Sequence, residues 1–483
     1  MIFPMGDCPG GLLPTVLIAL CSCSGDGVGA EESSSKGQRA ARSGDVRMHS
    51  TVASLEAAED VVDEATAGTG KPDVPAGRWF KLRGAADDLK GAAGREDPLK
   101  GQGALAGIGY SGAYNESGEF SGAIVYDPDR VEPGLTLFCS GHDTSVLLID
   151  SEGAIVHHWH LDFDEVFPNP LPFETMEFHS EFVRRAWPLP NGDLLAIFEY
   201  TGITRVDANG KPLWVLANQS HHDFKVLEDG TIVTLDIERR DLSWMRKHYH
   251  TSRFHKGIVD SHVVFLSAKG EVLRKVSIFE AILNSRFAGF LHAISPRLED
   301  IFHANSVDLV DAATAARHSL FEEGDILVSL RNPSAVLAID GKTEEVKWIS
   351  QGLSVAQHQA SFLSTGSIML LDNAGGNASF PLKIDQSRVI EIDPETQEIL
   401  WRYPPLGRDV NFRTEMLGYA ERLPGGNTLI TESMQGHLLE VSPEGEIVWE
   451  YYSPYRAGEN DELITTLMGG RRIPRAALPF LGE

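Results

Sequence analysis

The chain has 483 residues, of which 42% are hydrophobic and 23% are charged, a composition that excludes a fibrous or wholly disordered protein. Its 42 basic and 69 acidic side chains give a formal net charge of -27. Nucleic acids and acidic membrane surfaces bind to basic patches, so neither is an expected partner of this acidic chain. A small anionic ligand stays open, because it responds to the local field of a pocket more than to the total charge.

Residues 1–24 are expected to form an export leader. The apolar run from Leu12 to Leu20 is too short to span a bilayer and fits the central part of an export signal. The residues around Cys23 resemble a bacterial lipoprotein cleavage box, which would make Cys23 a lipidated membrane tether. Against an export signal, the first seven residues contain Asp7 and no Lys or Arg, so a wrongly assigned start or an unstructured tail stays the alternative. The expected location is exported, either periplasmic or anchored in the envelope.

Residues 25–121 are expected to be a low-complexity tether. They are rich in Ala, Gly, Ser, Glu and Asp with few aromatic side chains, so they bury too little apolar surface to fold alone, apart from a helix around 52–65. Three of the four cysteines precede this segment, which leaves Cys139 as the one thiol of the body. The body therefore has no internal disulfide, and Cys139 is expected to be a small buried hydrophobic residue.

Residues 122–460 read as a repeated β structure. Short Val, Ile, Leu, Thr and Phe runs are separated by Gly, Pro, Asn and Asp, which predicts strands joined by turns. One sequence motif recurs: a strand, a turn with Gly, a strand, a second turn and then, in most copies, a Trp. The copies are Gly134 to Trp159, Gly192 to Trp214, Gly230 onward, Gly324 to Trp348, Gly366 to Trp401 and Gly426 to Trp449.

The repeat predicts an all-β fold, a six-bladed β-propeller preceded by a poorly structured N-terminal segment. Trp401 and Trp449 are 48 residues apart, the length of one four-stranded blade. Six such units expose strand edges unless they close into a ring. The glycines are expected to form hairpin turns and the tryptophans to pack between blades. Residues 461–483 are expected to be a C-terminal tail.

Polar side chains recur at fixed distances from the hairpin glycines. Eight residues before the glycine stand Arg184, His222, His358 and Gly418, and seven residues after it stand Arg331 and Asn373. Both offsets lie at the open end of a two-strand hairpin, and the first strand of each blade lies nearest the axis. We place His303 and Asn305 there by analogy, because the first hairpin of the fourth unit carries an insertion. These side chains are expected to converge on one mouth of the central channel.

Three histidines and an arginine at such a mouth indicate function, because polar groups near the axis must otherwise be hydrogen-bonded or wet. Histidine serves in metal ligation or in nucleophilic and acid–base chemistry. The neighbouring arginine disfavours a metal ion and favours an oxyanion such as sulfate, phosphate or carboxylate. No metal and no cofactor are therefore expected, and no glycine-rich phosphate loop before a helix is present.

An ordered set of motifs resembles the bacterial arylsulfotransferase family. The segments that carry the resemblance are Ser220 to Leu227, His303 to Ser306, Ser329 to Asn332, Gln357 to Gln359, Leu371 to Gly375 and Arg422 to Ile430. The similarity extends from about Gly134 to Pro454. Each motif alone is weak, whereas their order is specific.

The resemblance implies a propeller enzyme that moves a sulfuryl group from an aryl sulfate ester to a phenol, without a nucleotide donor and through a sulfated histidine. It implies that His358 is the nucleophile and that Arg331, His222, His303 and Asn305 bind the sulfuryl oxygens. One of the histidines would protonate the leaving phenoxide. A neutral imidazole is a competent nucleophile near neutral pH and divides one transfer into two steps. Further expected substrate contacts are His221 and Asn373.

Several points stay open. His221 and His222 are adjacent, and the offset favours His222 as the one that faces the channel. The stretch from Trp244 to His262 is dense in His and Arg and is expected to be a solvated loop, with a lid as the sharper alternative. His142, His179, His292 and His437 are expected to be structural or exposed. A non-catalytic binding or scaffold propeller is the alternative function. A quinone-dependent oxidoreductase is disfavoured, because such propellers usually have eight blades. The oligomeric state is not predicted.

Overall fold

The computed structural model describes residues 113–116, 118–170, 181–242, 257–294, 299–317, 319–373, 386–408, 410–414, 416–458 and 460–482. All of them belong to the second of two units into which the chain divides, Ala58–Glu483. The expected leader and nearly all of the expected tether lie outside the described residues. Among the described helices, none is long and apolar enough to cross a membrane.

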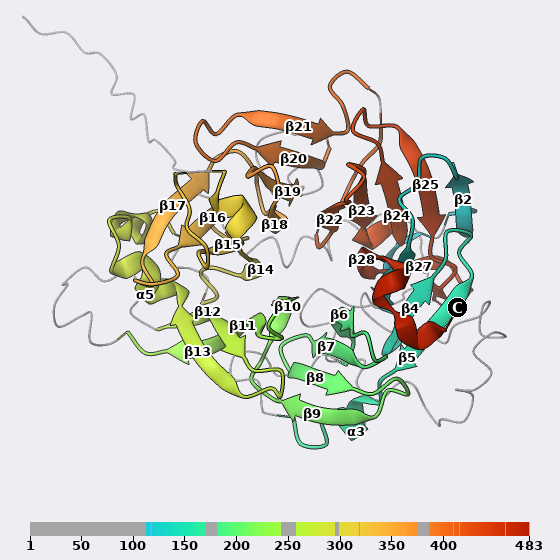
Figure 1. The fold of residues 1–483 in the computed structure, drawn as a ribbon, viewed down its shortest axis with the longest axis horizontal. Coiled ribbons are helices and arrows are strands. Elements are labelled where there is room, and N and C mark those ends of the chain that lie inside the picture. The colour runs from blue at the N-terminus through green and yellow to red at the C-terminus, as the bar shows by residue number, and fades with distance from the viewer. Residues whose placement is uncertain are drawn as a thin grey trace, which may run out of the picture. The chain divides into compact units, whose positions relative to one another are not determined.

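Six antiparallel sheets form the blades of a propeller and surround a common centre (Figure 1). The strands of the first three blades, from the centre outward, are β28 (Leu467–Ile473), β3 (Leu135–Ser140), β4 (Ser145–Ile149) and β5 (Ile155–His160); β6 (Val183–Pro188), β7 (Leu194–Phe198), β8 (Gly202–Val206) and β9 (Pro212–Leu216); and β10 (His221–Val226), β11 (Ile232–Arg240), β12 (Ile258–Leu266) and β13 (Val272–Ser277).

The other three blades follow the same order from the centre outward. Their strands are β14 (Ala304–Leu309), β15 (Ile326–Leu330), β16 (Ala335–Ile339) and β17 (Val346–Gln351); β18 (His358–Phe362), β19 (Ile368–Asp372), β20 (Arg388–Ile392) and β21 (Ile399–Tyr403); and β22 (Tyr419–Arg422), β23 (Thr428–Glu432), β24 (His437–Val441), β25 (Ile447–Tyr452) and β2 (Gly122–Tyr126). The inner strands contact one another in a closed ring, β28, β6, β10, β14, β18, β22 and back to β28. The predicted all-β six-bladed propeller is confirmed.

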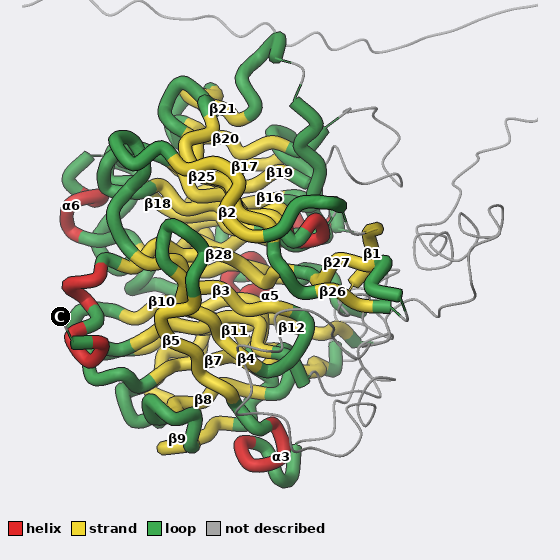
Figure 2. Tube along the Cα trace, turned by 90° about the vertical axis from the view of Figure 1, so that its right-hand side faces the viewer, coloured by secondary structure: helices red, strands yellow, loops and turns green. Residues whose placement is uncertain are grey.

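Smaller elements lie between and beside the blades (Figure 2). A three-stranded sheet contains β1 (Ala113–Glu116), β27 (Leu463–Thr465) and β26 (Arg456–Ala457). The helices are short: α3 (Phe163–Val166), α5 (Ile278–Leu283), α6 (Ala312–Ala315), η2 (Ala288–His292), η3 (Ser433–Gln435), η4 (Arg475–Ala477) and η5 (Pro479–Leu481). Helix α6 lies in the insertion that the sequence predicts in the first hairpin of the fourth blade.

The predicted C-terminal tail is wrong. Residues 467–473 form β28, the inner strand of the first blade, which pairs with β3 through partners such as Leu467 with Ser140 and Ile473 with Leu135. Strand β2, near the N-terminal end of the described residues, pairs with β25 at the outer edge of the sixth blade. A C-terminal strand thus completes the first blade and an N-terminal strand extends the sixth, and each covers a strand edge that would otherwise stay unpaired.

The repeated glycines and tryptophans have the predicted structural roles. Each hairpin glycine has a positive φ, for example 84° at Gly230, which suits a residue without a Cβ. Each repeated indole donates to a backbone carbonyl of the next blade. The pairs are Trp159 to Gly192, Trp214 to Ala268, Trp348 to Pro394, Trp401 to Pro443 and Trp449 to Ser151. The third blade, which has no such Trp, uses Arg274 in its outer strand, which donates to the Gly341 carbonyl.

The hydrophobic core lies between neighbouring blades. The middle strands β4, β16 and β19 are buried on both faces, because blades pack on each side of them, whereas the outer strand β9 alternates in exposure. One core cluster joins the first and second blades and includes Leu148, Trp159 and Phe198. Cys139 belongs to the same cluster and is buried, as predicted. Burial raises the pKa of its thiol to about 12, so it is inert at neutral pH.

Candidate active site

The predicted site residues gather at one end of the blade hairpins. His221 and His222 begin β10, His358 begins β18, and His303 and Asn305 lie at the start of β14. Arg331 follows the end of β15, and Asn373 follows the end of β19. The start of an inner strand and the end of the next strand share one end of an antiparallel pair. The structure therefore brings residues from the third, fourth and fifth blades to one mouth of the channel.

The inner strands are distorted where they carry these residues. The pairing register shifts between His221 and Phe224, between Ala304 and Ser306, and between His358 and Ser361. His222, His303 and Gln359 have positive φ angles of 57°, 47° and 51°. Such conformations cost free energy for residues with a Cβ and concentrate at functional sites. The bulges turn these side chains out of the regular ladder.

His358 is held in one tautomer. Its Nδ1 lies 2.7 Å from Oδ1 of Asn373, and the amide nitrogen of Asn373 donates to the carbonyls of Thr414 and Leu417 at 2.7 and 2.8 Å. These two bonds turn the amide oxygen toward His358. Because a carbonyl oxygen only accepts, Nδ1 carries the ring proton and Nε2 keeps its lone pair. Nε2 is buried and has no hydrogen-bond partner among the described residues.

The surroundings of His358 keep the ring neutral. Burial lowers its pKa well below the ordinary value, and the charges of Arg331, Arg184 and His303 lower it further, against the hydrogen bond to Asn373. A neutral imidazole with a free Nε2 lone pair is the nucleophilic form of histidine. His358 therefore meets the geometric and protonic demands on a nucleophile.

Asn373 does not have the predicted substrate contact. Its amide oxygen accepts from His358, both donors of its nitrogen are used, and the residue is fully buried. It has no donor left for a substrate. Asn373 orients His358 instead.

His303 is paired with a carboxylate, Asp300, that was not among the predicted site residues. Its Nδ1 lies 2.7 Å from Oδ2 of Asp300, and its backbone N–H donates to Oδ1 at 2.8 Å. Burial alone would raise the pKa of Asp300, but the His303 charge and hydrogen bonds hold that pKa below its ordinary value. The carboxylate orients the imidazole and stabilises a proton on it. The rings of His303 and His222 lie 5.0 Å apart, nearly perpendicular.

Two arginines approach the same site. Arg331 donates to Oδ1 of Asn332 at 3.1 Å, and Asn332 donates to the Asp300 carbonyl at 2.6 Å, so Arg331 is tied to the segment that carries His303. Among the described residues, Arg331 forms no ion pair. Arg184, on β6, donates to the Met468 carbonyl at 3.1 Å. The site therefore combines two guanidinium groups with the neutral rings of His222 and His358, a composition that suits an oxyanion.

The neighbouring histidines have different positions. His222 lies beside His303, and the charges that lower its pKa include those of His303, Arg184 and His358. His221 lies behind it, stacked on the Tyr200 ring at 5.1 Å, and its Nδ1 is 2.8 Å from Nδ1 of His222. His222 thus contacts the His303 ring, whereas His221 contacts His222 and Tyr200. The charges of His303 and Asp300 also act on His221.

Asn305 can fill only part of its predicted role as a ligand for sulfuryl oxygens. Its amide nitrogen donates to the Gln357 carbonyl at 2.8 Å, which leaves one N–H for a ligand. Its Oδ1 is buried without a partner among the described residues. An amide oxygen repels a sulfuryl oxygen and accepts from a hydroxyl group. Asn305 can therefore meet either an anion or a hydroxyl group.

Glu199 is a further residue at this site that was not predicted, although it stands at a predicted offset from a hairpin glycine. Glu199 stands seven residues after Gly192, and its Oε2 lies 3.5 Å from Nε of Arg184, which stands eight residues before the same glycine. The two residues thus repeat the paired positions of Asn373 and His358 in another blade. Glu199 is fully buried and accepts from the backbone N–H of His222 at 3.0 Å.

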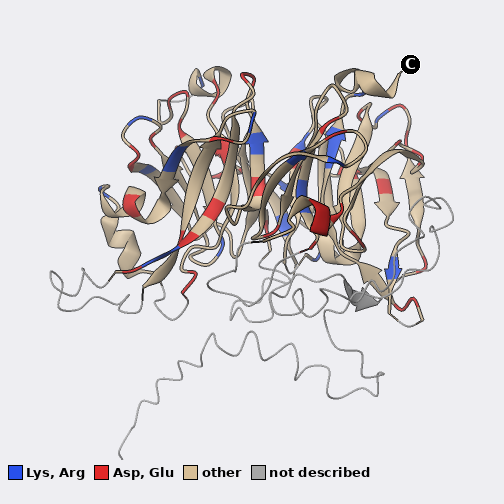
Figure 3. Cartoon of the chain, turned by 90° about the horizontal axis from the view of Figure 1, so that it is seen from below, with Lys and Arg blue, Asp and Glu red and all other residues tan. Residues whose placement is uncertain are grey.

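One residue further along the inner strands, buried polar side chains from different blades contact one another. Arg185 donates to Oε1 of Gln359 at 3.0 Å, lies 3.2 Å from Oδ1 of Asp223, and covers the Tyr419 ring at 4.2 Å. Inner strands β6 and β28 each carry an arginine pair, and Figure 3 shows Lys and Arg on strands near the middle of the view. The inner strands β6 and β28 therefore carry basic side chains, although the chain as a whole has a negative net charge.

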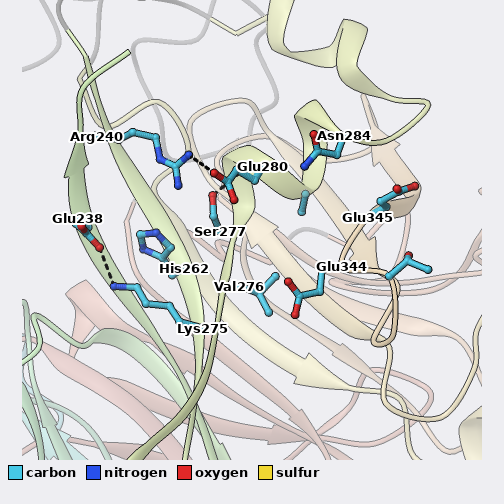
Figure 4. Close-up of a pocket in the computed structure, with 12 residues that line it drawn as sticks. Glu238, Arg240, His262, Lys275, Val276, Ser277, Glu280, Asn284, Glu344 and Glu345 are labelled. Atoms are coloured by element: carbon cyan, nitrogen blue, oxygen red, sulfur yellow. Dashed lines mark hydrogen bonds and ion pairs between the residues drawn. The ribbon is translucent and has the colours of Figure 1, made fainter. Parts of the chain in front are cut away.

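A separate polar pocket of about 440 Å³ is lined by residues of β11, β12, β13 and α5 and by the turn before β17 (Figure 4). Its lining contains none of the predicted site residues. Its charged side chains largely pair with one another, for example Arg240 with Glu280 at 2.6 Å and Lys275 with Glu238 at 3.1 Å. At the channel mouth, the unpartnered Nε2 of His358 lies in a site that also carries Arg331 and Arg184, so that site is the better candidate for chemistry.

Some of the other histidines named in the predictions lie outside the described residues, and the rest have structural contacts or are exposed. Residues 243–256, most of the expected loop over the mouth, lie outside the described residues, as does His179. His262 lies in β12, buried between Asp236 and Asp260. His142 stacks on Tyr455, His437 pairs with two glutamates, and His292 is exposed. No group of three or more His, Cys, Asp or Glu in the described part of the chain is arranged to hold a metal ion.

The fold and site together define a six-bladed propeller with a buried histidine and arginine cluster at one mouth. The family model described as arylsulfotransferase (ASST) matches residues 186–454, more than half of the chain and all of the predicted site residues. The chain belongs to the arylsulfotransferase family. Membership supports arylsulfotransferase activity in general and makes the protein a transferase.

Other comparisons are more distant. No curated protein matches the chain. A Bacteroides caccae protein of unknown function is 14% identical with a TM-score of 0.44, covering 69% of this chain and 97% of its own. BamB from Moraxella catarrhalis is 12% identical with a TM-score of 0.30, covering 69% and 82%. The Doa1 WD40 propeller domain is 12% identical with a TM-score of 0.38, covering 74% and 97%. With scores this low, the description of the fold rests on the strand order above.

Proposed function

We propose that the protein transfers a sulfuryl group from an aryl sulfate ester to a phenol in two steps, through a sulfated His358. The observation that carries the proposal is the fixed tautomer of His358, with Nε2 unpartnered and its pKa lowered. A sulfate monoester is an anion, which suits the charges of Arg331 and Arg184. No nucleotide donor and no cofactor enter the reaction.

In the first step, Nε2 of His358 attacks sulfur, an N–S bond forms, and the S–O bond to the aryl group breaks. The leaving phenoxide takes a proton from the imidazolium form of His303, which Asp300 stabilises. Arg331, His222 and the free N–H of Asn305 donate to the sulfuryl oxygens, on which negative charge is distributed in the transition state. An aryl leaving group reduces the demand on the acid, because its ring stabilises the negative charge.

In the second step, the acceptor phenol replaces the first product. Neutral His303 removes the phenol proton, the phenolate oxygen attacks sulfur, and the N–S bond breaks. His358 returns with Nε2 unprotonated and His303 returns protonated, so both side chains are back in their starting protonation states.

We also propose that the protein works outside the cytoplasm, either in the periplasm or tethered through Cys23. The support is the apolar run and the cleavage box of residues 12–24. Fractionation, together with a Cys23→Ser variant, tests the tether.

The transfer is tested with p-nitrophenyl sulfate and a phenol. We expect nitrophenolate release that depends on the acceptor, and a loss of at least about 10³-fold in His358→Ala, because the nucleophile is removed. His292→Ala, at an exposed histidine outside the cluster, serves as the matched control. Unchanged release by His358→Ala would rule out the nucleophile. No transfer to any phenol, together with retained binding of the sulfate ester, would favour a non-catalytic binding propeller.

A further inference from the structure

Glu199 is a buried carboxyl group at the channel site that the proposed transfer does not use. It follows β7 directly and is completely buried. Its Oε2 accepts from the backbone N–H of His222 at 3.0 Å, and its Oε1 lies 3.1 Å from Nδ1 of the same histidine. Arg184 lies 3.5 Å away. Glu199 therefore faces the side of His222 that points away from the sulfuryl site.

Two polar atoms lie close to Nδ1 of His222, namely Nδ1 of His221 at 2.8 Å and Oε1 of Glu199 at 3.1 Å. Burial lowers the pKa of both histidines, that of His221 to about 3, so both rings are neutral. Only one proton can lie between two imidazole nitrogens in contact, so one histidine donates and the other accepts.

The charge on Glu199 selects between the two arrangements. A carboxylate only accepts, so it favours a proton on Nδ1 of His222 and leaves the Nε2 lone pair toward the channel. A neutral carboxyl group removes that preference. His221 then donates to Nδ1 of His222, and His222 carries its own proton on Nε2.

The two tautomers have opposite effects on an anion. Sulfuryl oxygens only accept, so an Nε2–H group binds them and an Nε2 lone pair repels them. The carboxylate form also offsets the charge of Arg184, whereas the neutral form leaves that charge for the ligand. Both effects favour anion binding when Glu199 is protonated.

We propose that Glu199 is a positioning residue that works as a neutral carboxylic acid, keeping His222 as a hydrogen-bond donor, and that its ionisation weakens the sulfuryl site. The proposal deepens the proposed function, because it takes the sulfate ester as the ligand of that site. Glu199 acts only through His222 and Arg184 and need not touch the substrate.

The electrostatics place this ionisation near neutral pH. Burial raises the pKa of Glu199 to about 7, against the lowering effects of Arg184, the His222 N–H and Arg185. The charged and titratable groups that face it are Arg184 and Arg185 from β6 and His221 and His222 from β10. The charge of Arg185 is shared with Asp223. A bound anion would raise the pKa of Glu199 further, so binding should take up a proton above neutral pH.

The first test is the pH profile of kcat/KM with p-nitrophenyl sulfate. The wild-type value should fall about tenfold per pH unit above the pKa of Glu199. Glu199→Gln cannot ionise and should lose the part of this alkaline fall that Glu199 causes, keeping only the part that comes from deprotonation of the general acid His303, while staying within about tenfold of wild type on the acid side. Glu440→Gln changes another buried carboxylate, on β24 of the sixth blade, which pairs with Arg472 on β28, and it should keep the wild-type profile. An unchanged alkaline fall in Glu199→Gln would overturn the proposal.

The second test needs no turnover. Inorganic sulfate binding, measured by calorimetry, should weaken from pH 6 to pH 9 in wild type and stay nearly constant in Glu199→Gln. If sulfate binding follows this pattern but no transfer occurs, the proposed function fails and the role of Glu199 survives. If transfer occurs but both proteins show the same pH dependence of binding, the role of Glu199 is wrong. Glu199→Met, similar in size and also unable to ionise, serves if the Gln variant does not fold.

Discussion

His358 owes its reactivity to neighbours that never touch the substrate. Asn373 holds Nδ1–H, and the backbone carbonyls of Thr414 and Leu417 hold Asn373. Without the amide oxygen, the ring could rotate or place its proton on Nε2, and either change removes the lone pair from the sulfur. Nucleophilicity is therefore a property of this chain of contacts and not of the imidazole alone.

Asn373→Ala tests this dependence at the residue scale. We expect kcat to fall on the order of 10- to 100-fold with KM little changed, because the variant loses orientation and not substrate contacts. Asn373→Asp keeps an acceptor oxygen and should recover part of kcat. Equal kcat values in wild type and Asn373→Ala would contradict the assignment.

Part of this site could be predicted from the sequence. The offsets from the hairpin glycines predicted Arg331, His358 and Asn373 together, because the offset encodes position in a hairpin. They could not distinguish a side chain that binds substrate from one that orients a neighbour, which is why Asn373 received the wrong role. The offsets could not predict Asp300, because it lies outside the repeat, in the irregular segment before β14.

At the scale of the elements, the blades are joined by a repeated contact in the outer strands. Five indoles donate to carbonyls of the following blade, and Arg274 does so in the third. The Trp pattern could be predicted, since it is a local repeat. The replacement by Arg274 could not, because nothing local marks an arginine as an inter-blade donor.

Trp449→Phe tests the contact that joins the sixth blade to the first. The indole is fully buried and donates to the Ser151 carbonyl at 2.8 Å. Phenylalanine leaves that carbonyl unpaired, so we expect the free energy of unfolding to fall by about 1–3 kcal/mol in denaturant titrations. Trp214→Phe, at a less buried indole, should cost less. A Trp449→Phe variant as stable as wild type would show that the contact contributes nothing.

At the scale of the molecule, the C-terminal strand closes the ring and also serves the site. Strand β28 pairs with β3, and its Met468 carbonyl accepts from Arg184. The sequence could not predict this strand, because it contains Gly469, Gly470 and two arginines and lacks strand alternation. Its pairing with the first blade is a long-range contact that no local pattern encodes.

A chain that ends at Thr466 tests the closure. It lacks β28, so it exposes the edge of β3 and leaves the core of the first blade uncovered. We expect loss of the cooperative thermal transition, measured by circular dichroism, whereas a chain that ends at Ala477 keeps β28 and should still unfold cooperatively. Wild-type melting of the shorter chain would show that β28 does not hold the ring.

The central claim is the covalent intermediate, and the most direct measurement is the mass of the protein after incubation with p-nitrophenyl sulfate and no acceptor. We predict an added sulfuryl group on the peptide that contains His358, which disappears when a phenol is supplied and never forms in His358→Ala. Transfer to a phenol without any such adduct, or an adduct that persists in His358→Ala, would contradict the account.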